Sequence, residues 1–507
     1  MDAKVKTSHS VFPLVIIAAI SLGVYSSTLF NGFVYDDNHI LLSNVWIRGF
    51  SHAPDILSSS LMSFDEAKTA SNTYRPFLFF LFMAEHYVFG FKPWGFHLVN
   101  IILHAANAVL VFYLASFLFK GGGYNPDKPV PAAPPVFAGL VFSLHTINTE
   151  AVNWVSAQAE LTYAFFTLAS FNLYLRAASG RLSARLALSA FLFFLALFFK
   201  ETAAALIPII FLYELSARGR GLLKAWRGYL LFLTAAFAFM ALRTYAVGGI
   251  MRHKQAELSL WGAILNMFPL IAGYFKKLVY PSGLNILYEF HPAREVFDLR
   301  VIAGLIILIL FLLAAVSFRK NKPVFIALLA SSMPLLPVLY IPALSSAAFA
   351  DRYLYLPSAG FALLLAYALS RAMDKGRAEG FAAIFISVLL LFSYSAASIE
   401  RGSVWRDDYA LWGDALKKSP NNPNVHYNFA WASHGKGDLK NAAAHYVETI
   451  RLDRGASDAH YNLGVIYAYQ NRPIEAAFEF REALRINPGY KEAGERLSQI
   501  EESGGIE

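Results

Sequence analysis

Apolar runs of about 20 residues recur along the first 400 residues of the chain, which is 507 residues long. A helix needs about 20 mostly apolar residues to cross a hydrocarbon core. Of all residues, 56% are hydrophobic and only 15% are charged, whereas soluble domains carry about 25% charged residues. The sequence therefore predicts an all-α, polytopic membrane protein and excludes a single soluble enzyme.

We expect about eleven membrane spans. The first run follows Lys4 and Lys6 and exceeds the roughly 7–15 apolar residues of a signal peptide, so we expect a membrane helix with a cytoplasmic N-terminus. Segments 76–89 and 261–280 are expected to lie in the membrane interface. The expected spans are 11–30, 96–119, 135–150, 154–175, 184–199, 202–215, 228–247, 299–318, 323–342, 352–371 and 380–399.

Lys and Arg concentrate in cytoplasmic loops of membrane proteins. With eleven spans, five basic clusters fall on the side of the N-terminus: Lys120/Lys128, Arg176/Arg181/Arg185, Arg218/Arg220/Lys224/Arg227, Arg319/Lys320/Lys322 and Arg371/Lys375/Arg377. The opposite side then holds the large loops 31–95 and 248–298 and everything after residue 400. If segment 261–280 crossed the membrane instead, the later basic clusters would lie outside.

A period of 34 residues begins after residue 400, where Tyr427-Asn428 recurs as Tyr461-Asn462. This is the length of a tetratricopeptide helix pair. A final helix from Lys491 would cap the array, as such repeats require. The pattern predicts a short tetratricopeptide superhelix.

The sequence thus predicts a membrane domain over residues 1–400 and an extracytoplasmic repeat domain over 401–507. Tetratricopeptide superhelices offer a concave surface that suits an extended peptide. We therefore expect a protein or peptide partner, with Asn428 and Asn462 as its contacts. The net charge of +8 is explained by cytoplasmic loops, and no nucleic-acid partner is expected.

Two adjacent carboxylates, Asp36 and Asp37, follow the first span. One carboxylate beside a hydroxyl can remove its proton while its neighbour orients it or holds a divalent cation. The alternative is that both solvate a loop and cap a short helix. Glu150, near His145, lies on the next external turn, and an ionisable residue there suggests a functional role. His145 itself is expected to pack rather than to bind metal.

Cationic residues lie on the same predicted side. Arg352 begins a span from outside, where its planar guanidinium suits a lipid phosphate; interfacial anchoring is the alternative. Lys200-Glu201 closes another external turn, as an ion pair or as a site for an anionic head group. Arg75 and His97 are supporting candidates on the first loop.

The sequence lacks a Walker loop, a dinucleotide fingerprint, a zinc-protease motif and any Cys. A nucleotide-driven enzyme and thiolate metal sites are therefore not expected. External carboxylates, nearby cations and a peptide-binding superhelix together suit a lipid-linked donor with a phosphate leaving group. The need for a divalent metal stays open.

Several short motifs resemble the transmembrane-and-tetratricopeptide O-mannosyltransferases and their bacterial relatives. The resemblance implies the C-type membrane glycosyltransferase fold, an external or lumenal active site and a polyprenyl-phosphate-linked sugar donor. It also implies that an acidic residue on the first external loop is the base, which corresponds to Asp36 or Asp37. The motifs are NGFVYDD (31–37), YRPF (74–77), GFHLVNIILHAAN (95–107), HTINTEAV (145–152), FKE (199–201) and DRYLYLP (351–357).

We therefore expect an inverting glycosyltransferase that moves a sugar, mannose by resemblance, from polyprenyl phosphate to a hydroxyl acceptor on protein. Asp36 or Asp37 would be the base, Arg352 and Lys200 would bind the donor phosphate, and Glu150 would orient donor or acceptor. The expected location is a bacterial inner membrane with the repeats in the periplasm, or the endoplasmic reticulum in a eukaryote. The alternatives are a non-catalytic membrane-anchored scaffold and, ranked third, a flippase of lipid-linked sugars.

Overall fold

The computed structural model describes residues 11–65, 71–121, 133–177, 183–218, 226–249, 258–339 and 348–502, which form helices and turns and contain no strand. Lys4, Lys6 and parts of the two large loops lie outside these residues. The chain divides into two compact units. The first is Met1–Leu284 with His291–Ser403, and the second is Asn285–Phe290 with Val404–Glu507. We refer to them as the membrane unit and the repeat unit.

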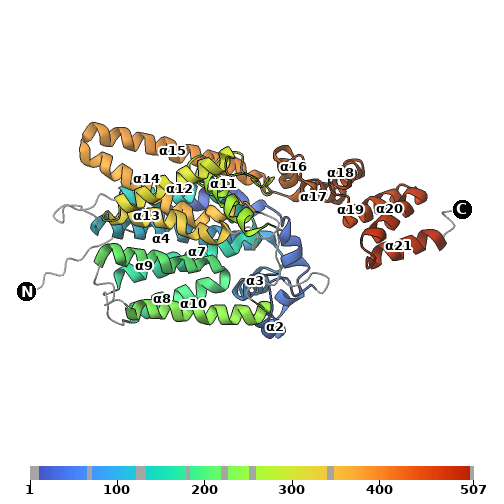
Figure 1. Cartoon of the computed structure of the whole chain (residues 1–507), viewed down its shortest axis with the longest axis horizontal. Coiled ribbons are helices and arrows are strands. Elements are labelled where there is room, and N and C mark those ends of the chain that lie inside the picture. Colours follow the sequence, from blue (N-terminus) through green and yellow to red (C-terminus); the bar gives the residue numbers. More distant parts are fainter. Residues whose placement is uncertain are drawn as a thin grey trace, which may run out of the picture. The chain divides into compact units, whose positions relative to one another are not determined.

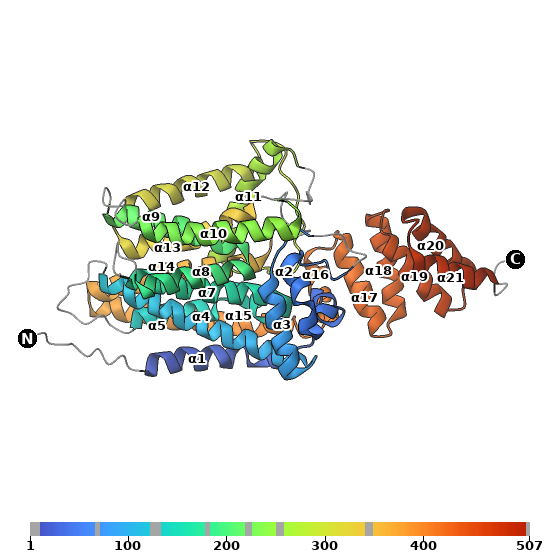
Figure 2. The same ribbon diagram turned by 90° about the horizontal axis from the view of Figure 1, so that it is seen from below.

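The membrane unit is a bundle whose long helices run side by side, with α2 and α3 at one end (Figures 1 and 2). Its helices are α1 (Phe12–Val24), α2 (Ala53–Ser58), α3 (Pro76–Phe89), α4 (Pro93–Gly121), α5 (Ala133–Leu144), α6 (Thr149–Asn153), α7 (Gln158–Arg176), α8 (Ala184–Phe199), α9 (Leu206–Arg218), α10 (Trp226–Val247), α11 (Leu260–Val279), α12 (Leu299–Ser317), α13 (Lys322–Ser332), α14 (Tyr355–Lys375) and α15 (Arg377–Ser403).

Six stretches of the described residues are long and apolar enough to cross a membrane: Pro93–Lys120, Gly228–Val247, Leu299–Ser317, Lys322–Leu339, Asp351–Lys375 and Arg377–Ser403. These coincide with six of the expected spans, so the chain is an integral membrane protein. The other five fall on α1, α5, α7, α8 and α9, which are shorter or less apolar. The count of eleven is therefore not confirmed. One reason is visible at 135–150, where α5 ends at Leu144 and turns follow.

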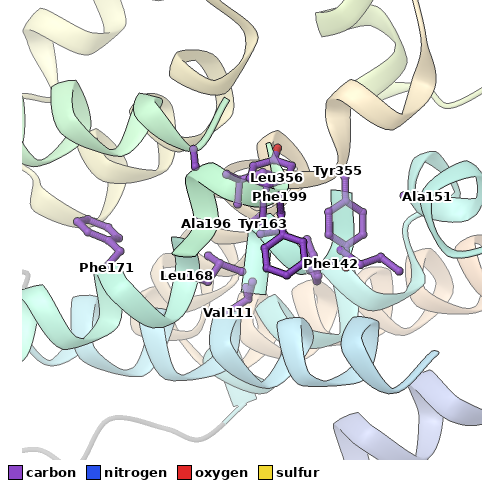
Figure 3. Close-up of a cluster of buried hydrophobic side chains, with 14 of the residues drawn as sticks. Val111, Phe142, Ala151, Tyr163, Leu168, Phe171, Ala196, Phe199, Tyr355 and Leu356 are labelled. Carbon is purple, nitrogen blue, oxygen red and sulfur yellow. The ribbon is translucent and has the colours of Figure 1, made fainter. Parts of the chain in front are cut away.

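The core of the membrane unit is aromatic and aliphatic, and it joins α4, α5, α7, α8 and α14 (Figure 3). Phe142, Tyr163 and Tyr355 are fully or almost fully buried in it. Helices α13 and α14 approach closely at Gly360, where a β-carbon would collide with the Ala327 carbonyl. Close packing of this kind fixes the helix ends and so the turns between them.

The repeat unit consists of antiparallel helix pairs in the predicted register. Helices α17 and α19 begin 34 residues apart, as do α18 and α20. Trp412, Tyr446 and Phe480 recur at the same spacing, and all three are buried. Its helices are α16 (Asp408–Lys418), α17 (Pro423–Gly435), α18 (Leu439–Leu452), α19 (Ser457–Tyr469), α20 (Pro473–Ile486) and α21 (Lys491–Glu502).

Segment Asn285–Phe290, which sequence analysis placed in an external loop, packs within the repeat unit. The Asn285 amide donates to Ser419 Oγ at 2.9 Å, and the Asn421 main-chain N–H donates to Glu289 Oε1 at 2.9 Å. Ser419 Oγ also donates to the Leu287 carbonyl at 2.9 Å. The segment therefore completes the start of the helical array.

Candidate active site

The two adjacent aspartates have different surroundings. Asp37 is fully buried, and its Oδ1 accepts hydrogen bonds from the main-chain N–H of Ser156 at 2.7 Å and from Ser156 Oγ at 2.5 Å. Its Oδ2 accepts from the Val34 main-chain N–H at 3.1 Å. Asp36 is only half-buried. Asp37 therefore holds the turn in place, and Asp36 is the more accessible carboxylate.

Burial raises the pKa of the Asp37 carboxyl to about 7, and the negative charge of Asp36 adds to this rise. The hydrogen bonds from Ser156 and Val34 oppose it, because they stabilise the ionised form. Asp37 therefore titrates close to neutral pH.

Glu150 and Arg352 form an ion pair that joins α6 to the 3-10 turn (Asp351–Leu354) before α14. Arg352 Nη1 donates to Glu150 Oε1 at 2.6 Å, and the Arg352 main-chain N–H donates to Glu150 Oε2 at 3.2 Å. The guanidinium also lies over the rings of Trp154 and Tyr353, at 5.2 and 5.1 Å from their centroids. Both Glu150 oxygens thus fix Arg352, whose planar group keeps further N–H donors.

Residues 149–157 comprise the short helix α6 and the 3-10 turn after it; this segment, here called the bridging loop, connects the two halves of the site. The loop carries Glu150, which holds Arg352, and Ser156, which holds Asp37. Between them, Trp154 stacks on the Tyr35 ring with centroids 5.6 Å apart. The predicted base and the predicted phosphate contact are therefore brought together by one short segment.

Hydrogen bonds among buried side chains hold the bridging loop in place. The Gln158 amide donates to Glu85 Oε1 at 2.7 Å and to Asn100 Oδ1 at 2.9 Å. The Asn100 amide then donates to the carbonyls of Val152 and Trp154 at 3.1 and 3.3 Å. Helices α3, α4 and α7 thereby fix the loop's backbone.

Lys200 follows α8 and is almost fully buried. It is ion-paired with Glu160, and its ammonium lies 4.8 Å from the Tyr353 ring centroid. Burial lowers the pKa of Lys200 to about 8, although Glu160 opposes the change and Arg75 reinforces it. Tyr353 contacts both Lys200 and Arg352, so these predicted phosphate ligands share a neighbour.

Glu201 joins two arginines at the same end of the bundle. Its carboxylate lies 4.0 Å from Arg75 Nε and 3.6 Å from Arg243 Nε. The Arg243 guanidinium also donates to the Asn72 carbonyl at 2.7 Å. Arg75 and Glu201 were predicted as supporting residues, and Arg243 joins them from α10.

The two histidines that were predicted as supporting residues, His97 and His145, contact main-chain carbonyls. His97 Nε2 lies 3.4 Å from the Gly32 carbonyl oxygen, and His145 Nε2 lies 2.9 Å from that of Leu278. His97 thereby supports the turn that leads to Asp36, and His145 ties the start of the next turn to α11. Among the described residues no group of three or more His, Asp or Glu could hold a metal ion.

In the repeat unit, Asn428 and Asn462 lie at equivalent positions of α17 and α19. The Asn428 amide donates to the Asn424 carbonyl at 2.7 Å, and the Asn462 amide donates to Tyr427 Oη at 3.1 Å. Asn462 therefore links successive repeats, and both side chains stay partly exposed.

The sequence did not mark Tyr35, Ser156 or Arg243 as site residues. It also did not mark Asn100 and Gln158, whose hydrogen bonds hold the bridging loop in place. Tyr35, Asn100 and their neighbours lie inside the motifs noted above, but a motif does not say which atoms meet. Ser156 and Gln158 had one signal, since they are polar residues at the start of a predicted span.

The chain is similar to protein O-mannosyl-transferases over most of its length. Human TMTC3 is 24% identical in an alignment of 517 residues covering 94% of this chain and 55% of that protein. Mouse TMTC4 is 28% identical over 496 residues, covering 85% and 65%. The resemblance predicted from the motifs is confirmed, and the chain spans little more than half the length of the human relative.

The repeats match a family model described as tetratricopeptide repeat over residues 457–490. A crystal structure of ArnT from Cupriavidus metallidurans bound to undecaprenyl phosphate aligns with 90% of this chain and 81% of that chain, at 14% identity and a TM-score of 0.41. The described helices, six of them long and apolar enough to cross a membrane, and the tetratricopeptide match agree with the predicted all-α membrane bundle followed by repeats.

Proposed function

We propose that the protein is an inverting membrane glycosyltransferase of the C type, which moves mannose from a polyprenyl-phosphate donor to a hydroxyl on a protein acceptor. The observation that carries this proposal is the bridging loop, which places a carboxylate turn next to a fixed guanidinium. The names of the similar proteins support mannose and a protein acceptor.

In the proposed reaction, Asp36 takes the proton of the acceptor hydroxyl as its oxygen attacks the anomeric carbon. The bond from that carbon to the phosphate oxygen breaks, and polyprenyl phosphate leaves with the electron pair. Asp37 positions Asp36 by anchoring its turn to Ser156. General bases of this kind contribute about 10²- to 10⁴-fold to a rate.

Arg352 binds the departing phosphate, and Glu150 positions Arg352 rather than touching the substrate. A preorganised cation stabilises charge that develops on the leaving group. Lys200, Arg75 and Arg243 add positive charge to the same end of the bundle, partly balanced by Glu160 and Glu201. The chelator arm of the test below decides whether a divalent cation takes part.

The repeat unit presents the protein acceptor, with Asn428 and Asn462 as peptide contacts. With eleven spans, the first external loop and the residues after 400 fall on the same side of the membrane, so the proposal puts the acceptor and the site outside the cytoplasm. In a bacterium this is the periplasmic side of the inner membrane, and in a eukaryote it is the lumen of the endoplasmic reticulum.

The test is transfer of radiolabelled mannose from polyprenyl phosphate to protein by purified chain, with and without chelator. Wild type is expected to label protein, and the Asp36→Asn, Asp37→Asn double variant is expected to label none. Photo-crosslinking from positions 428 and 462 should capture the acceptor peptide. If the folded wild type transfers no sugar from any lipid phosphate, the non-catalytic scaffold becomes the better account.

A further inference from the structure

Tyr35 has a backbone conformation that its residue type avoids. Its φ is +53°, in the left-handed region, where an L-residue brings its β-carbon close to a carbonyl oxygen. Within the described ranges, the only other non-glycine residue with positive φ is Asn471, and asparagine tolerates this region far better. A bulky aromatic held there signals that its side chain, not its backbone, is what the position requires.

The Tyr35 ring is linked to both halves of the site. It directly precedes Asp36 and stacks on Trp154, over whose ring the Arg352 guanidinium also lies. The charges of Asp36, Glu150 and Arg352 all act on its phenol. Tyr35 is therefore close to the proposed base and to the proposed phosphate contact at once.

The geometry of the proposed reaction indicates where the transferred sugar binds. In an inverting displacement, the attacking oxygen and the leaving phosphate lie on opposite sides of the anomeric carbon. The transferred sugar must therefore lie between Asp36 and Arg352. Tyr35 is linked to both, because it directly precedes Asp36 and stacks on Trp154, over whose ring the Arg352 guanidinium lies.

We propose that Tyr35 contacts the transferred sugar of the donor, with its phenol hydrogen-bonded to one sugar hydroxyl and its ring packed against the sugar. The inference rests on the proposed function and adds to it a determinant of sugar specificity. Aromatic rings offer both an apolar face and a polar handle, which suits a sugar.

The first experiment separates side chain from backbone. Tyr35→Gly relieves the backbone conformation, because glycine adopts positive φ without a steric penalty. We expect this variant to keep the wild-type melting temperature within a few degrees and to lose most transfer. Full transfer by Tyr35→Gly would overturn the inference, since the ring would then be dispensable.

The second experiment compares donors. Wild type, Tyr35→Phe and the control Tyr87→Phe, whose side chain is exposed on α3, are each given polyprenyl-phosphate mannose and a series of its monodeoxy analogues. Tyr35→Phe should lower kcat/KM for mannose by about 5- to 10-fold, the usual value of one neutral hydrogen bond. For the one analogue that lacks the contacted hydroxyl, it should match wild type.

The outcomes distinguish the inference from the function on which it rests. Equal loss for every donor, or no loss for any, would overturn the sugar contact while leaving the transferase intact. No transfer by wild type with any donor would instead overturn the proposed function. Tyr87→Phe should behave as wild type throughout, which excludes a general effect of losing a phenol.

Discussion

At the scale of single residues, Asp36 and Asp37 are neighbours in sequence but differ in exposure and bonding. Asp37 accepts three hydrogen bonds and is buried, whereas Asp36 is half-exposed. Asp36→Asn should therefore lower kcat by at least about 100-fold, the lower range for a general base. Asp37→Asn should lower it by about 10-fold, because the amide still accepts some of these bonds. Initial rates of sugar transfer test this, and a greater loss in Asp37→Asn would reverse the two roles.

The pH dependence of kcat/KM follows from two shifted groups. Asp37, raised to a pKa of about 7 by burial, loses its negative charge as the pH falls through 7, so its bonds to Ser156 weaken and activity falls. Lys200, lowered to a pKa of about 8, loses its positive charge as the pH rises through 8. Asp36 faces the first group, and Glu160 and Arg75 face the second.

We therefore expect a narrow, bell-shaped pH profile of kcat/KM, which falls below about pH 7 and above about pH 8. Lys200→Arg should extend activity above pH 8, because arginine keeps its charge. Asp37→Asn should remove the limb near pH 7. A profile that is flat between pH 6 and 9 would contradict both assignments.

At the scale of elements, the bridging loop depends on Asn100. Asn100→Ala removes the amide donor to the buried Val152 carbonyl and one of the two donors to the Trp154 carbonyl, which keeps the Ala157 N–H. Leaving a buried acceptor unpaired costs about 1–3 kcal/mol. We expect the free energy of unfolding to fall by that amount and kcat to fall about 10-fold, since the loop holds both Arg352 and Asp37 through its side chains. Glu85→Gln is the matched control, because glutamine still accepts from Gln158. Thermal unfolding in detergent would measure the change in stability, and initial rates would measure the change in kcat. Full activity in Asn100→Ala would show that the bridging loop does not need the hydrogen bonds from Asn100.

Several elements were predictable and others were not, for physical reasons. Long apolar helices and the 34-residue repeat follow from local patterns, so α4, α15 and the α17–α20 pairs appear where expected. Helices α1 and α5 lie on expected spans but end earlier, at Val24 and Leu144, because hydropathy does not mark where a helix ends and a turn begins. Sequence selected Glu150 and Arg352 as charged residues at turns, but only the fold reveals that they pair.

At the scale of the whole molecule, the chain passes between its two units at residues 284–285, 290–291 and 403–404. The segment 285–290 is bound into the repeat unit by Asn285, which is almost fully buried. A domain boundary near residue 400 assigns these six residues to the membrane domain. The sequence could not correct this, because six residues inside a long loop carry no repeat pattern. The repeat unit is therefore attached to the chain at more than one point.

Asn285→Ala should loosen the start of the repeat unit, because Ser419 loses a buried partner. We expect hydrogen exchange of the amides in α16 and the first turn of α17 to quicken by about 5- to 30-fold, corresponding to about 1–2 kcal/mol. Exchange in α20 should not change. The control is Asn487→Ala, whose exposed side chain accepts a local hydrogen bond from the Gly489 main-chain N–H. Unchanged exchange in α16 would show that the segment does not stabilise the array.

The most direct measurement of the central claim counts both products of one reaction. Purified chain is given polyprenyl-phosphate mannose and an acceptor protein, and sugar gained by protein is measured beside polyprenyl phosphate released. We predict equal amounts for wild type, and loss of both in the folded Asp36→Asn and Arg352→Gln variants. Release of polyprenyl phosphate without sugar on protein, or unchanged transfer by Asp36→Asn, would contradict the account.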